Sequence, residues 1–268
     1  MMATSVLTEK PLRRALVMAA SQGLGRAAAH ALAAAGVDVV VSSSSAARCE
    51  ATAAELRASC GVRAHGIAAD MFDPPAMDRL VATATDALGG IDILVINYPG
   101  PALGTAASVD LQVLETHFRS MVLSPLRLIK HVLPQMRRHQ WGRIVTVGGR
   151  GMVAPLPNKV TDNTLRPALL AYSKALSNEV AAEGVTLNFV LPGTFLTDRV
   201  QASTTSNAAL QGISFEQAMR QRLQGIPAGR FGALAEFGAA VAFLCSEGAS
   251  YVTGSVLRVD GGQIDSIL

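Results

Sequence analysis

The chain has 268 residues, half of them apolar and only 16% charged, which excludes a disordered or fibrous protein. Its net charge of +3 comes from scattered basic residues, so a nucleic-acid-binding surface is not expected. The first apolar stretch, Ala15 to Ala20, is too short for a membrane span or a signal-peptide core. Three cysteines without a CxxC pair predict neither a disulfide framework nor a metal site. We therefore expect a soluble protein of the reducing cytoplasm.

Short apolar runs rich in β-branched residues alternate with segments of helical length along the chain. Because apolarity is continuous within each run, both faces of the predicted strands should be covered. This order predicts an α/β fold with a single doubly wound parallel sheet, Rossmann-like, and helices on both faces, as one domain over residues 1–268. The predicted strands are residues 15–20, 37–42, 62–69, 91–96, 142–148, 185–191 and 255–260, and the main predicted helices are residues 23–35, 46–59, 74–88, 111–139 and 163–183.

Residues 194–224 interrupt this alternation. A polar cluster, Ser203 to Asn207, is followed by a helical stretch from Phe215 to Gln224. Since α/β sheets bind ligands in loops at the carboxyl ends of strands, this segment is interpreted as a mobile substrate lid. The lid lacks a cluster of charge, which favours a small apolar substrate over an acyl carrier, a sugar phosphate or a nucleic acid.

A glycine turn joins the first predicted strand to the first predicted helix. The strand ends in Ala19-Ala20-Ser21-Gln22-Gly23-Leu24-Gly25, and the helix begins at once. Backbone N–H groups and the positive end of a helix bind a pyrophosphate in such a turn. Glycine between a strand and a helix is also ordinary turn chemistry, so the turn alone does not establish a nucleotide site.

Further motifs make the chain resemble the short-chain dehydrogenase/reductase family, from about residue 12 to residue 263. The family's TGxxxGxG is matched by Met18 to Gly25, with Ala19 replacing the first glycine, and its NNAG by Ile96-Asn97-Tyr98-Pro99. The other matches are Asp70, Pro192-Gly193, Thr197, residues 227–232, Phe243-Leu244, Thr253-Gly254 and Asp260-Gly261-Gly262. The resemblance implies a nicotinamide dinucleotide cofactor.

The resemblance also implies which residues contact that cofactor. Ser21, Gln22, Gly23 and Leu24 would hold the pyrophosphate, Asp70 and Met71 the adenine, Asn97 the adenosine side, and Pro192, Gly193 and Thr197 the nicotinamide carboxamide. Two of these residues have simpler alternatives. Asp70 would cap a helix or close a turn, and Thr197 would cap a helix.

The end of the second predicted strand indicates the type of cofactor. It reads Val40-Val41-Ser42-Ser43-Ser44, without an acid to accept the two ribose hydroxyls of NAD. The hydroxyls of Ser43 and Ser44, with Arg48 one helical turn further on, suit a 2′-phosphate. The sequence therefore predicts NADP rather than NAD.

The family's four catalytic residue types are absent from the positions that its spacing implies. Family members use tyrosine, lysine, serine and asparagine for proton transfer and carbonyl polarisation. Here Asp162 stands at the tyrosine position, Arg166 at the lysine position, Gly149 at the serine position and Met121 at the asparagine position. A nearby Tyr172-Ser173-Lys174 contains two of the types, but residues two apart do not share a helix face.

Asp162 and Arg166, four residues apart, are expected to form an ion pair on one helix face. Arg166 would bind the ribose hydroxyls, and a charged Asp162 would stabilise a cation such as an iminium beside the nicotinamide. Asp162 could instead be the N-cap of a helix that starts at Asn163, and Pro167 could delay that start.

Four further residues are candidate proton sources. His117 lies one turn before Met121 and is included with Asp162 and Arg166 among the catalytic candidates. The others are Arg150, Lys159 and Tyr98, although a lone histidine or tyrosine is more often a hydrogen-bonded structural residue.

Three functions stay open at this point. The first is an atypical NADP-dependent oxidoreductase that reduces a carbonyl or imine of a small apolar substrate, with substrate or water as the proton source. The second is a nucleotide-binding protein without redox turnover, and the third is a non-redox cyclase or lyase with Asp162 as general base. The related halohydrin dehalogenases share an arginine at the lysine position but keep the serine and tyrosine, so they fit poorly. The resemblance also implies a homo-oligomer, a tetramer, that buries residues 111–139, 163–183 and 255–268.

Overall fold

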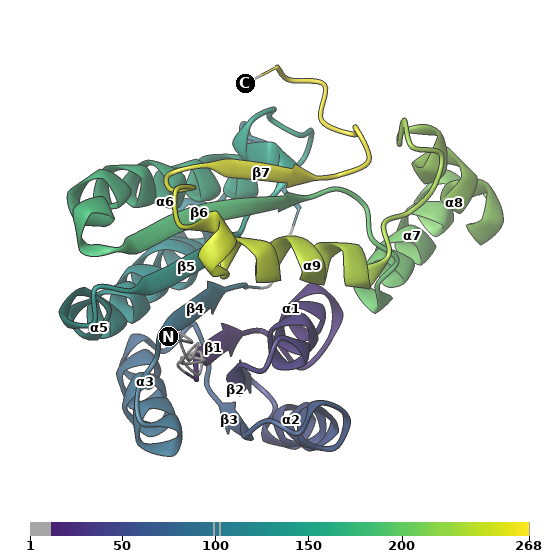
Figure 1. Ribbon diagram of the computed structural model, residues 1–268. Coiled ribbons are helices and arrows are strands. Elements are labelled where there is room, and N and C mark those ends of the chain that lie inside the picture. Colours follow the sequence, from purple (N-terminus) through teal and green to yellow (C-terminus); the bar gives the residue numbers. More distant parts are fainter. Residues whose placement is uncertain (1–11, 99, 102, 268) are drawn as a thin grey trace, which may run out of the picture.

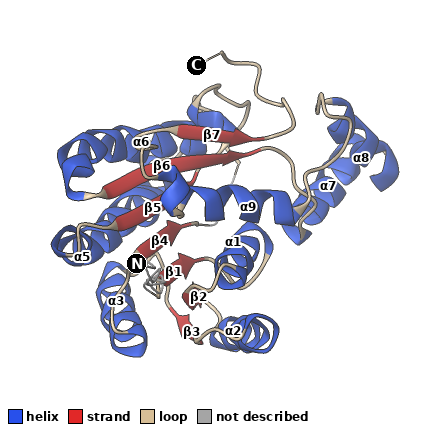
Figure 2. Cartoon of the chain, viewed as in Figure 1, coloured by secondary structure: helices blue, strands red, loops and turns tan. Residues whose placement is uncertain are grey.

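The computed structural model describes residues 12–98, 100–101 and 103–267. Its strands form one parallel sheet in the order β3-β2-β1-β4-β5-β6-β7, with helices on both faces (Figures 1 and 2). The predicted fold class is therefore confirmed, and each strand overlaps its predicted run. The strands are β1 (Arg14–Met18), β2 (Asp38–Ser43), β3 (Ala64–Ala68), β4 (Ile93–Ile96), β5 (Gly142–Val147), β6 (Val185–Pro192) and β7 (Val256–Val259).

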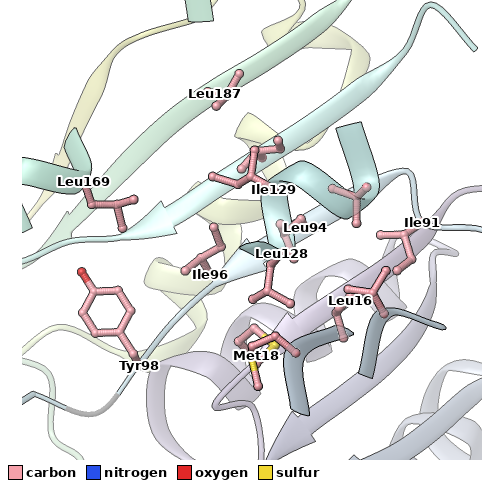
Figure 3. Packing of buried hydrophobic residues seen from close by; sticks show 14 of the residues in the cluster. Leu16, Met18, Ile91, Leu94, Ile96, Tyr98, Leu128, Ile129, Leu169 and Leu187 are labelled. Atoms are coloured by element: carbon pink, nitrogen blue, oxygen red, sulfur yellow. The ribbon is translucent and has the colours of Figure 1, made fainter. Parts of the chain in front are cut away.

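Two apolar layers hold the helices on the sheet. Three helices cover one face, namely α1 (Gly23–Ala34), α2 (Ala46–Cys60) and α9 (Leu234–Leu244), and three cover the other, namely α3 (Pro74–Leu88), α5 (Ser124–Arg138) and α6 (Val160–Val180). Figure 3 shows part of the second layer, in which Leu16 and Ile96 of the sheet meet Leu128 and Ile129 of α5. Burial on both faces explains why the strands read as continuous apolar runs.

The predicted helix over residues 111–139 is interrupted. α4 (Leu111–Phe118) passes into a π-helical turn at Arg119–Leu123 before α5 begins. Pro125 explains the wider turn, because it has no N–H for the carbonyl of Met121 and its ring would clash with that carbonyl in a regular α-helix. Met121 therefore lies at the centre of a distorted turn.

α6 begins at Val160, earlier than the predicted start at Asn163. The Val160 N–H donates to the carbonyl of Gly104 at 3.2 Å, and this contact with a distant loop supports the earlier start. Lys159 is the N-cap residue, so the alternative that Asp162 caps the helix is wrong. Pro167 lies inside the helix and does not delay its start.

The polar cluster Ser203 to Asn207 is helical and not a loop, because it lies within α7 (Asp198–Gln211). Its hydroxyls are satisfied inside the helix: Thr205 Oγ1 donates to the carbonyl of Gln201 at 3.1 Å, and Ser206 Oγ to that of Ala202 at 3.1 Å. The predicted stretch from Phe215 to Gln224 is confirmed as α8. Both helices stand at the carboxyl-end side of the sheet, beyond β6 (Figure 1).

The sheet has a topological switch point between β1 and β4, where the chain direction of the crossovers reverses. The carboxyl ends of these two strands form the crevice in which open α/β sheets bind ligands. Within the described residues, no helix is both long enough and apolar enough to span a membrane.

Candidate functional site

The glycine turn after β1 opens directly onto the N-terminus of α1. Gln22 is the N-cap residue but makes no side-chain cap, so the first amides of α1 are left to another acceptor. Gly23 has φ +56°, and an added Cβ there would lie 3.7 Å from Cγ2 of Thr197. A pocket of about 200 Å³ is lined by Ser21, Gln22, Gly23, Arg26, Leu196, Thr197, Asp198 and Leu234. The structure thus brings the predicted pyrophosphate turn and Thr197 together in a cradle that fits an anion.

The same turn contains a strained residue. Ala19, which replaces the family's first glycine, has φ +47°. Its carbonyl accepts a hydrogen bond from Nδ2 of Asn97 at 3.3 Å, and an added Cβ on Gly25 would lie only 2.2 Å from it. Close packing on both sides therefore holds Ala19 in the left-handed region that favours glycine.

Ala19→Gly should raise the free energy of unfolding by about 1 kcal/mol, because glycine adopts a positive φ without steric cost. Denaturant unfolding monitored by circular dichroism measures this change. Ala20→Gly is the control, since Ala20 does not have a positive φ and is fully buried, and it should lower stability. Equal stability of wild type and Ala19→Gly would contradict the assignment of strain.

The residues predicted for the adenosine end lie at neighbouring strand ends. Asp70 is exposed, and its Oδ1 accepts a hydrogen bond from the Phe72 N–H at 2.9 Å, so it closes a turn after β3. Met71 is buried, and its carbonyl accepts from Ser124 Oγ at 2.7 Å. Asn97 follows β4 and braces the turn at Ala19. These contacts fix the walls of the crevice, and their roles toward a nucleotide stay predictions.

The serines at the end of β2 make different contacts. Ser43 Oγ lies 3.0 Å from Cys49 Sγ and accepts a hydrogen bond from the Ser45 N–H at 3.3 Å. Ser45 caps α2 through the Arg48 N–H. Ser44 and the Arg48 side chain are exposed, which leaves them accessible to a phosphate.

The residues after β6 are held against β7. Pro192 ends β6, and the Gly193 N–H donates to the carbonyl of Val259 at 3.0 Å. An added Cβ on Gly193 would lie 2.5 Å from Cα of Asp260, so only glycine fits. Thr197 is the N-cap residue of α7, with Oγ1 accepting from the Val200 N–H at 3.3 Å. The capping alternative for Thr197 is therefore correct, and its methyl group still faces Gly23.

The predicted pair of Asp162 and Arg166 is present and buried. Arg166 Nε donates to Asp162 Oδ1 at 2.7 Å, while Nη1 donates to the carbonyls of Gly148 at 3.0 Å and Val147 at 3.3 Å. The two side chains are only 13% and 10% exposed. Burial opposes the charge of Arg166, but Tyr98 and Asp162 outweigh it and raise its pKa. Nη2 takes part in none of these three hydrogen bonds.

Gly149 and Tyr98 complete the surroundings of this pair. An added Cβ on Gly149 would lie 3.4 Å from Arg166 Nε, so Gly149, which the sequence predicts at the serine position, faces the guanidinium. The Tyr98 ring centroid lies 4.7 Å from Arg166 Cζ. Its hydroxyl is buried without a hydrogen-bond partner among the described residues, and burial raises its pKa. Tyr98 lies at one end of the apolar cluster, near Ile96 and Leu169 (Figure 3).

Met121 packs in the same layer as Tyr98, whereas His117 does not contact the pair. The Met121 side chain is buried in the apolar layer that also contains Tyr98 and Met152. The His117 ring packs edge-on against Phe72, with centroids 5.6 Å apart, and its Nδ1 is buried without a partner within the described ranges. This packing does not bring His117 to the Asp162–Arg166 pair. Pro99, the last residue of the NNAG-like motif, lies outside the described residues.

The cation cluster around the pair was not predicted as a unit. Arg150, Lys159, Arg199 and Arg222 come from four separate segments, so no local sequence signal links them. In the regions that the structure covers, no group of His, Cys, Asp and Glu side chains suits a metal ion.

The sheet, the switch-point crevice and the uncapped glycine turn define a nucleotide-binding protein of the Rossmann-like class. A family model described as Enoyl-(Acyl carrier protein) reductase matches residues 18–263. The chain belongs to the short-chain dehydrogenase/reductase family.

Two curated relatives cover nearly the whole chain. NADPH-dependent reductase BacG of Bacillus subtilis is 31% identical over 256 residues, which are 95% of this chain and 99% of that protein. The 3-oxoacyl-[acyl-carrier-protein] reductase FabG of Escherichia coli is 33% identical over 255 residues, which are 93% of this chain and 96% of that protein.

Two solved structures are similar over the same extent. YwfH, an NADPH-dependent reductase involved in bacilysin biosynthesis, has a TM-score of 0.90 at 30% identity and covers 96% of this chain and 100% of its own. L-sorbose reductase from Gluconobacter frateurii, in complex with NADPH and L-sorbose, has a TM-score of 0.91 at 27% identity and covers 96% and 98%.

Proposed function

We propose that this chain is an atypical NADP-dependent oxidoreductase that reduces a carbonyl or imine of a small, largely apolar substrate. The observation that carries the proposal is the buried Asp162–Arg166 pair beside Gly149, at the carboxyl ends of the central strands. These residues stand where the family places tyrosine, lysine and serine. The names of the relatives, which include NADPH-dependent reductases, support the reductive direction.

The residues of the crevice fit NADP. The glycine turn offers uncapped helix amides to the pyrophosphate, and the end of β2 offers Ser44 and Arg48 to a 2′-phosphate. Thr197 stands beside the glycine turn, and Gly193 lies four residues before it; the resemblance implies that both face the nicotinamide carboxamide. When bound, the cofactor supplies a hydride.

The chain's own residues would position and stabilise the reacting groups. Arg166 is anchored through Nε and Nη1, and its Nη2 would donate to the ribose hydroxyls. Asp162, which accepts a hydrogen bond from Arg166 Nε, would stabilise positive charge on an acceptor such as an iminium. We assign the proton to water or to the substrate. The same pairing disfavours Asp162 as the general base of a lyase.

The surroundings of the crevice support two further parts of the proposal. Residues 194–224 would form the substrate lid, and they expose the apolar side chains of Leu196, Leu210 and Phe215. We also propose a homotetramer, because Leu111, Phe118 and other apolar side chains of the interrupted helix are exposed in the single chain.

NADPH should bind about tenfold to a hundredfold more tightly than NADH, since one charge-assisted phosphate contact contributes roughly 1.5–3 kcal/mol. Isothermal titration calorimetry measures both affinities. Ser44→Asp should remove the preference, because a carboxylate repels the 2′-phosphate and accepts from ribose hydroxyls. Ser59→Asp adds the same charge at the far end of α2, and this variant should keep the preference for NADPH. Equal affinity of wild type for the two cofactors would overturn the assignment.

A further inference from the structure

Two basic side chains, Arg150 and Lys159, lie on segments next to the Asp162–Arg166 pair, and two more, Arg199 and Arg222, belong to the lid helices. Arg150 follows Gly149 directly, and Lys159 is the N-cap residue of α6. These two segments pack together, because an added Cβ on Gly151 would lie only 2.4 Å from Asn163 Oδ1. Arg199 lies in the first turn of α7, and its guanidinium packs on Gly100. Arg222 of α8 donates to Ser203 Oγ at 2.9 Å.

Arg150 and Lys159 are half-buried cations without partners. Neither makes a hydrogen bond or an ion pair within the described residues, and neither side chain is fully exposed. Burial lowers the pKa of both; Asp162 opposes this for Lys159, while the charges of Arg150, Arg199 and Arg166 add to it. The charge of Arg222 also acts on Arg150. Such a group of unpaired cations is costly unless an anion compensates it.

The carboxylates that face this group are fewer than the cations, and within the described residues none forms an ion pair with Arg150 or Lys159. Asp162 is bound to Arg166. Asp260 accepts hydrogen bonds from the N–H groups of Gly262 and Ile264, and Asp265 is exposed. The carboxylates of Asp260 and Asp265 act on Arg150 only as charges near it. Positive charge therefore exceeds negative charge at the mouth of the crevice.

We propose that the substrate carries a carboxylate group, which binds between Arg150 and Lys159 while its carbonyl or imine faces the Asp162–Arg166 pair. This inference rests on the proposed reductase function and names its substrate class, an oxo or imino acid with an apolar body. A monoanion suits the site better than a phosphate dianion, because Asp162, Asp260 and Asp265 also act on Arg150 or Lys159. Half-buried cations likewise suit a small anion better than the surface of an acidic carrier protein.

Reduction leaves the carboxylate unchanged. The carbonyl carbon gains the hydride as its π bond to oxygen breaks, the oxygen gains a proton from water, and NADPH is oxidised to NADP⁺. Arg199 and Arg222, which belong to the lid, would close over the anion.

The test uses aliphatic and aromatic oxo acids, each paired with its uncharged methyl ester, and two readouts. Calorimetry without NADPH measures binding of each acid and ester, and NADPH oxidation measures kcat/KM. The acids should bind and react about tenfold to a hundredfold better than their esters, which corresponds to one charge-assisted contact. Esters that match or exceed their acids throughout the set would overturn the proposal, as would inorganic phosphate competing better than acetate.

Lys159→Met should remove the advantage of the acids over their esters. Lys130→Met is the matched control, because Lys130 is exposed on α5 and the change in net charge is identical. Acids that bind to a chain which does not oxidise NADPH would support the anion site and contradict the reductase function. Unchanged preference for acids in Lys159→Met would contradict the assignment of this residue.

Discussion

Arg166→Ala should both destabilise the fold and weaken NADPH binding. The substitution leaves Asp162 buried without its partner and the carbonyls of Val147 and Gly148 without their donor. Removing one member of a buried ion pair costs about 3–5 kcal/mol of unfolding free energy. Loss of the Nη2 donor should weaken NADPH binding about tenfold to a hundredfold. Denaturant unfolding and calorimetry measure the two effects.

Arg119→Ala provides the matched control for stability. Arg119 also pairs with an acid four residues away, Glu115 at 2.8 Å, but both side chains are more than half exposed. Its loss should cost at most about 0.5 kcal/mol. Arg166→Lys keeps the charge without the planar fork, so it should fold and still bind NADPH more weakly than wild type. Wild-type affinity in Arg166→Lys would contradict the ribose contact.

With an imine substrate, Asp162→Asn should reduce turnover roughly a hundredfold while changing the NADPH affinity less than about threefold. The amide oxygen can still accept from Arg166 Nε, so the geometry is kept, but the negative charge that stabilises the reacting cation is lost. Steady-state kinetics with calorimetry on the same protein separates the two effects. Because Asp162 is not a helix cap, the substitution tests charge rather than capping.

Tyr98→Phe controls for the hydroxyl next to this pair. That hydroxyl has no partner among the described residues, so its removal should not lower stability, and we expect turnover to stay near that of wild type. A loss of turnover only in Tyr98→Phe would make Tyr98 the proton donor. Wild-type turnover in Asp162→Asn would remove the aspartate from the mechanism.

The layout of the sheet was predictable because burial on both faces leaves continuous apolar runs in the sequence. The Asp162–Arg166 pair was also predictable from local sequence, because side chains four residues apart lie on the same helix face. Pro125 causes the π turn at Met121, but the periodic pattern of residues 111–139 predicted one uninterrupted helix. The start of α6 depends on the Gly104 carbonyl, and such a non-local contact leaves no periodic signal.

The cation cluster also depends on contacts between distant segments, which the sequence pattern does not reveal. The lid sequence, residues 194–224, carries three arginines among many polar residues and no cluster of charge, which favoured an apolar ligand. The structure adds Arg150 and Lys159, from the loop between β5 and α6, to Arg199 and Arg222 of the lid. Charge at a site assembled from distant segments cannot be counted within one segment.

The central claim is that this crevice transfers a hydride with Asp162 and Arg166 in place of the family's tyrosine and lysine. The most direct measurement is mass spectrometry of the product formed from an imino acid and NADPH carrying deuterium at the transferred position. We expect wild type to deliver one deuterium to the former imine carbon, and Asp162→Asn to deliver it far more slowly. NADPH that binds but yields no labelled product with any acid, ester or imine would contradict the claim and leave a nucleotide-binding protein without redox turnover.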